Sequence, residues 1–88
     1  MLTIPNAVEE VVKNKPFLEG ALIEGLINLS ALARSIKTEV ESRVGKDVTE
    51  SAIVMALNRL VPKLEQNTRL KVQQIIDNMG DIIVRSSL

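Results

Sequence analysis

The side chains in this sequence that could take part in catalysis are carboxylates, and several of them occur as near neighbours. The pairs are Glu9 with Glu10, Glu19 with Glu24, and Glu39 with Glu41. Carboxylates act as general acids, bases or metal ligands when a histidine, a nucleophile or further ligands stand beside them. The 88 residues contain no histidine and no cysteine, and the four glycines form no phosphate-binding loop. We therefore expect no catalytic residue, no cofactor and no metal site, and predict that the protein is not an enzyme.

A second kind of chemistry is the reading of DNA bases by an exposed helix face. If the helix that follows Gly45 buries Ile53, one set of residues lies on its opposite side. Asparagine and arginine suit the edges of adenine and guanine, whereas Glu50 in the first turn would repel phosphate. This face therefore has three interpretations: a DNA-reading surface, a protein or dimer interface that includes Val54, or a solvated surface. The residues are Ser51, Met55, Asn58, Arg59 and Pro62.

Basic residues on the preceding helix and turn could contact a phosphate backbone. They are Arg34, Lys37, Arg43 and Lys46, and Glu39, Glu41 and Asp47 are interleaved among them. Eleven basic and eleven acidic residues leave no net charge, whereas DNA-binding domains usually carry a basic face. A helix side with alternating charges facing solvent explains the pattern as well.

The elements that position these residues are two amphipathic helices within residues 27–60, joined by a turn at Gly45. Apolar residues recur at steps of three and four on both sides of the turn, which predicts a packed helix pair. Asp47 and Glu50 form a capping box for the second helix. The stripes comprise Leu29, Leu32, Ala33, Ile36, Val40 and Val44, then Ile53, Ala56, Leu57, Leu60, Val61 and Leu64.

Two short helices precede this pair. Asn6 with Glu9 predicts a capping box for the first, and Pro16 begins the second. Residues 26–28 are predicted to be a short extended segment. Ser30 is the preferred N-cap of the helix that follows, with Asn28 as the alternative.

The C-terminal third is predicted to contain a break, a helix and a strand. Pro62 should end or kink the preceding helix, and residues 67–79 form another helix that carries Val72, Ile75, Ile76 and Met79. Gly80 is expected to close it. The β-branched run in residues 81–85 then predicts a strand. Its core, Ile82, Ile83 and Val84, could pair with the segment near Ile27, with the same strand of a second copy, or with sequence outside this chain.

Three groups of segments together resemble the N-terminal region of uncharacterised bacterial regulatory proteins. In that family a helix-turn-helix-like part precedes an ACT-type ligand-sensing domain, and some members are labelled aspartate kinase. The resemblance implies a regulatory protein without kinase chemistry in this part. The segments are Pro-Phe-Leu-Glu at 16–19 with Gly-Leu-Ile-Asn-Leu-Ser-Ala-Leu-Ala-Arg at 25–34, Ala-Ile-Val-Met-Ala-Leu-Asn-Arg-Leu at 52–60, and Gly-Asp-Ile-Ile-Val-Arg-Ser at 80–86.

The sequence therefore predicts a mainly α fold: one domain spanning residues 1–88, the N-terminal part of a longer protein, with a winged-helix-like core and one C-terminal strand. No apolar run approaches the length of a membrane span, and no leader sequence is evident, so we expect a cytoplasmic protein. The leading functional hypothesis is a homodimeric assembly module that buries Val54, Met55 and the strand 82–84. The alternative is sequence-specific binding of double-stranded DNA through Ser51, Asn58 and Arg59, with Arg34, Lys37 and Lys46 on phosphates.

Overall fold

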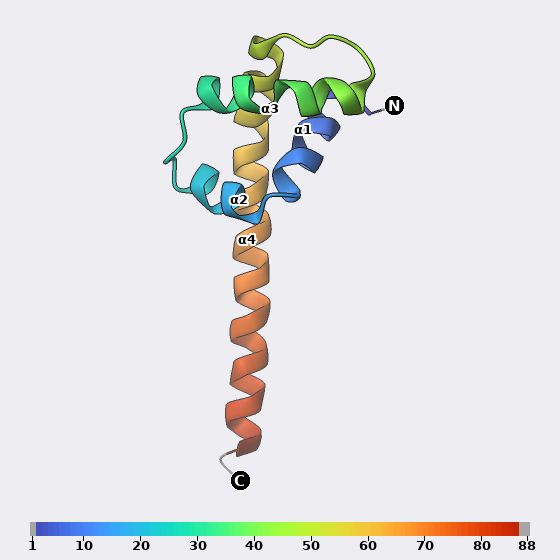
Figure 1. Cartoon of the computed structure of the whole chain (residues 1–88). Helices are drawn as coiled ribbons and strands as arrows, with labels where there is room; N and C mark the ends of the chain where they lie inside the picture. Colours follow the sequence, from blue (N-terminus) through green and yellow to red (C-terminus); the bar gives the residue numbers. More distant parts are fainter. Residues whose placement is uncertain (1, 87–88) are drawn as a thin grey trace.

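The computed structural model describes the backbone of residues 2–86 and the side chains of residues 2–80. Three short helices gather around one end of a long fourth helix, which continues beyond them as a rod (Figure 1). The helices are α1 (Ile4–Lys13), α2 (Pro16–Ile23), α3 (Leu29–Val44) and α4 (Glu50–Ser86).

Side-chain caps fix where the helices begin. The Thr3 hydroxyl accepts a hydrogen bond from the Asn6 N–H at 3.3 Å, so Thr3 caps α1 and the cap predicted at Asn6 is wrong. The Asn28 side chain accepts from the Ala31 N–H at 3.0 Å. Of the two alternatives for α3, Asn28 rather than Ser30 is therefore the N-cap.

The turn between α3 and α4 has the predicted glycine but a different cap. Gly45 ends α3 with a φ of 85°, a left-handed conformation that glycine adopts without steric cost. The Thr49 hydroxyl accepts from the Ala52 N–H at 3.1 Å. The predicted cap, Asp47, is therefore replaced by Thr49, and α4 begins at Glu50.

The core forms where α1, α2 and α3 meet the first four turns of α4. It is made of aliphatic side chains, as a sequence with one aromatic residue requires, and Phe17 itself is 73% exposed on α2. Leu64 is the last buried residue along the described part of the chain. The largest fully buried side chains are Ile36, Ile53, Leu57, Val8, Val11, Val12 and Val40.

The long α4 overturns three predictions, since it also continues past Gly80, which was expected to close a helix. Pro62 lies inside α4, which does not end there. Residues 67–79 belong to the same helix and not to a separate one. Residues 81–86, where a strand was predicted, continue the same helix. The part of the chain that the structure describes is all helical, so the predicted strand and the winged-helix architecture built on it are wrong, while the mainly α prediction is confirmed.

The result is an elongated molecule with extents of 61 × 27 × 17 Å and a radius of gyration of 17.1 Å. A compact domain of this length would have a radius of gyration of about 12 Å. We call residues 2–64 the head and residues 65–80 the α4 extension. The head contains the hydrophobic core, whereas the extension projects away from it (Figure 1).

Candidate protein interface

The α4 extension loses contact with the rest of the chain shortly after it leaves the head. Glu65 and Asn67 are still partly covered, but every residue from 68 to 80 is exposed. An isolated helix of this length is only marginally stable in water, because nothing packs against it. The extension is therefore a regular helix that is surrounded by solvent from residue 68 to residue 80.

Four aliphatic side chains line one side of the extension, and we call them the aliphatic stripe: Val72, Ile75, Ile76 and Met79. Their exposed fractions are 48%, 58%, 55% and 54%. The steps of three, one and three residues place them within one face of a helix. Leu70 is also 57% exposed, but it lies about 160° around the helix from Val72 and does not belong to the stripe.

The stripe continues a line of residues that the head already covers. Val54, Val61, Thr68 and Ile75 follow one another at intervals of seven along α4, which keeps them on nearly the same side of the helix. Val54 and Val61 are partly buried and pack against the core. The same side of one helix is thus covered within the head and bare beyond it.

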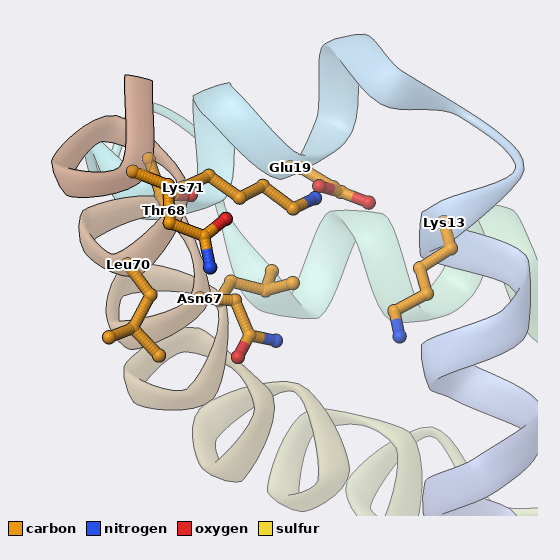
Figure 2. A pocket seen from close by; sticks show the side chains of 8 residues that line it. Lys13, Glu19, Asn67, Thr68, Leu70 and Lys71 are labelled. Carbon is orange, nitrogen blue, oxygen red and sulfur yellow. The ribbon is translucent and has the colours of Figure 1, made fainter. Parts of the chain in front are cut away.

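A cleft of about 510 Å³ opens where the extension leaves the head (Figure 2). Glu19 of α2 and Lys71 of α4 extend toward one another across it, and Lys13 lies at its far side. Most of its other residues carry amides, a hydroxyl or aliphatic groups, and its one carboxylate has no nucleophile beside it, so the arrangement offers no catalytic group. The full lining is Lys13, Glu19, Leu64, Asn67, Thr68, Leu70, Lys71 and Gln74.

One of the three cations predicted to contact DNA phosphates lies beside a carboxylate. Arg34 lies 3.7 Å from Glu50, the residue expected to repel phosphate. Lys37 is half-buried and Lys46 is exposed in the turn after α3. Arg43, which the sequence also places among the possible phosphate contacts, lies 3.3 Å from Glu10. Lys15 of the head lies 2.6 Å from Glu39.

The predicted base-reading residues are exposed but border different hollows. Ser51 lines a shallow hollow with Val54 and Met55. Arg59 lines another, which includes Ile4 and Pro5 of the α1 end. Asn58 is exposed and lines neither of these two hollows.

The residues predicted to form a dimer interface also differ in their surroundings. Met55 is 57% exposed, as expected, whereas Val54 packs partly against the core. Ile82, Ile83 and Val84 lie in α4 by their backbone, and their side chains fall outside the described residues. The surface that the sequence analysis missed is the aliphatic stripe, because its residues were expected to belong to a separate helix after Pro62, and no interface was assigned to them.

One carboxylate has a clearly altered acidity. Glu9 of α1 lies 2.8 Å from the Lys13 ammonium and 2.9 Å from the Lys63 ammonium. Hydrogen bonds from Lys13 and then Lys63 lower the pKa of Glu9 below its ordinary value of 4.5, and the Glu9 contact raises the pKa of Lys13. Because Lys63 belongs to α4, this cluster ties α1 to α4 and is structural.

Within the described residues, no group of side chains has the composition of a metal site, and no helix has the length and apolarity needed to cross a membrane. The chain was also compared with known proteins. No protein-family model, no curated protein and no solved structure matches it. The feature of the chain that points to a function is therefore the geometry of the α4 extension.

Proposed function

We propose that this protein is a non-catalytic assembly module that associates with itself through the α4 extension. The observation that carries the proposal is the aliphatic stripe, four half-exposed aliphatic side chains in the part of α4 where every residue from 68 to 80 is exposed. Fully burying one such side chain contributes roughly 1.5–3 kcal/mol relative to full exposure. A contiguous apolar face on an otherwise polar helix marks an interaction surface.

A second copy suits this surface because the residues that flank the outer part of the aliphatic stripe, farthest from the head, carry no charge. The residues beside Ile75, Ile76 and Met79 on the two edges of the stripe are Gln73, Asn78 and Gly80. Two identical surfaces can therefore meet there without like-charge repulsion. A partner chosen by charge would find no charged group at these positions.

This proposal replaces the interface predicted from the sequence. A strand at residues 82–84 cannot pair across a two-fold axis when the backbone there is helical. Val54 already contacts the head's own core. The proposed contact surface therefore lies in the outer part of α4 and not in its first turns.

Sedimentation equilibrium of the full chain tests the proposal with a matched pair of variants. Ile75→Asp places a charge within the stripe, and Leu70→Asp places the same charge on the opposite side of the same helix at nearly the same exposure. We expect the wild type and Leu70→Asp to form the same oligomer and Ile75→Asp to be monomeric. A monomeric wild type, or equal effects of both substitutions, would contradict the proposal.

The DNA-binding alternative is separated by titration with mixed-sequence duplex DNA at low salt. Association through aliphatic side chains is nearly indifferent to salt, whereas binding to phosphates weakens steeply as salt rises. We expect no salt-sensitive binding. Binding that is lost in Arg59→Ala and kept in Ile75→Asp would instead support DNA recognition. The proposal also includes a regulatory role, which the resemblance described in the sequence analysis implies. It includes the cytoplasmic location expected from the sequence as well.

A further inference from the structure

We infer that two copies pair antiparallel along the α4 extension, with the two-fold axis close to residue 74. The inference rests on the proposed self-association and adds its geometry. Around this axis Val72 of each copy faces Ile75 of the other, and Thr68 faces Met79. Each partner residue comes from the same 65–80 segment, so the surface is complementary to itself.

The first argument for this direction is the position of Glu65. Continuing the seven-residue interval upstream from Met79 and Val72 leads to Glu65, so the aliphatic line ends in a carboxylate near the head. A parallel pair in register would bring the two Glu65 side chains together, although Arg69 lies 3.9 Å from each. The antiparallel pair keeps the two carboxylates about 27 Å apart along the axis, since each residue adds about 1.5 Å.

The second argument is the uneven charge of the flanks. Arg69 and Lys71 border the stripe on its two sides near the head, whereas Gln73, Asn78 and Gly80 border it farther out. A parallel pair gathers the basic residues of both copies at one end. In the antiparallel pair Lys71 of one copy lies beside Asn78 of the other, so the cations are separated.

A stable pair requires contact along the whole extension, because the stripe alone is small. Four half-exposed aliphatic side chains per copy bury less than the ~1,000 Å² in total that a specific interface needs. Two helices that merely cross at the stripe would therefore associate weakly. Lengthwise packing over residues 65–80, about 24 Å of helix, adds the stems of Arg69 and Lys71 and the polar flanks to the buried surface.

Distances between spin labels test the direction, because the chain has no cysteine and each label can be placed at one site. The matched variants are Gln66→Cys and Asp77→Cys in the full chain. Both residues are exposed, and the eleven-residue interval places them about 20° apart on the helix, on the side away from the stripe. Their lateral contributions to the label distance are therefore equal, and only their positions along the axis differ.

In the antiparallel pair the two Gln66 positions lie about 24 Å apart along the axis and the two Asp77 positions about 9 Å apart. Because the lateral separation is the same for both, the Gln66-to-Gln66 label distance should be the longer one by several ångströms. Equal distances in a dimer would overturn the antiparallel inference and leave the proposed self-association standing. A chain that sediments as a monomer before and after labelling would overturn both. The Leu70→Asp substitution, added to each labelled variant, should leave both distances unchanged.

Discussion

At the scale of single residues, the Glu9 carboxylate shows how ionic contacts are used in the head. Its side chain is only 19% exposed and lies between Lys13 on its own helix and Lys63 on α4. Exposed ion pairs contribute little to stability, typically less than about 1 kcal/mol. A partly covered carboxylate that two lysines share is better placed, because one ordered group serves two contacts.

Substituting Glu9 with Gln should make the stability of the head less dependent on acid. The folded-state pKa of Glu9 is lowered below its ordinary value of 4.5, so the unfolded chain takes up the proton first. The stabilisation is therefore present above about pH 4.5 and is lost as the pH falls through the lower folded pKa. Chemical denaturation should show Glu9→Gln losing up to about 1 kcal/mol at pH 7 and much less at pH 3.

A matched control is Glu24→Gln. Glu24 is an exposed residue just after α2, with no ion pair among the described residues. The difference between wild type and this variant should change little between the two pH values. If Glu9→Gln and Glu24→Gln gave the same pH profile, the two-lysine contact would not be stabilising the fold.

At the scale of elements, the head was largely predictable from sequence and the second half of α4 was not. Apolar residues at steps of three and four form one face of a helix, and such a face is stable only when it is buried. Ile36, Val40, Ile53 and Leu57 accordingly lie in the core. Caps were harder to predict, because Thr3, Asn28 and Thr49 each have a polar neighbour whose side chain could cap a helix that begins two or three residues away.

The prediction of a break and a strand failed for two reasons. Pro62 is exposed, so water can satisfy the carbonyl left free one turn earlier and the helix continues past it. β-branched residues cost a helix only a few tenths of a kcal/mol each, and the run at 82–84 follows Met79 at helical steps. The aliphatic stripe was missed for the same reason, since a helix that ends at Pro62 has no extension.

Gly80 provides an element-scale prediction, because it lies within α4 with a helical backbone. A methyl group added there meets nothing within 4 Å in the single chain, and alanine in a helix interior is more favourable than glycine by roughly 0.5–1 kcal/mol. Gly80→Ala should increase the helical circular dichroism signal without weakening the head's thermal unfolding transition. Gly45→Ala should instead lower the temperature of the head's unfolding transition, because the φ of 85° at this position disfavours any residue with a side chain.

At the scale of the whole molecule, the described part of the chain combines a small folded head with a helical extension whose residues 68–80 are all exposed. Helices that lack tertiary contacts exchange their amide hydrogens readily, whereas amides in a packed core are protected up to the global stability. The proposed pairing supplies the missing contacts. Order in the extension and association of two copies are then linked equilibria.

This linkage predicts that helix content depends on protein concentration. Diluting the wild type below its dissociation constant should lower the helical circular dichroism signal and speed amide exchange in residues 68–80, while residues of the core remain protected. Ile75→Asp should show the diluted behaviour at every concentration, and Leu70→Asp should follow the wild type. A signal independent of concentration in all three proteins would contradict the linkage.

The bare extension also has a consequence for the lifetime of the protein. Arg69 and Lys71 lie in the stretch that the head leaves uncovered, and proteases cut such stretches in proportion to how often they open. A protomer that meets another copy hides these sites, whereas a solitary one presents them. Survival would then rise with abundance, because the paired fraction grows with concentration and unpaired copies are cut first.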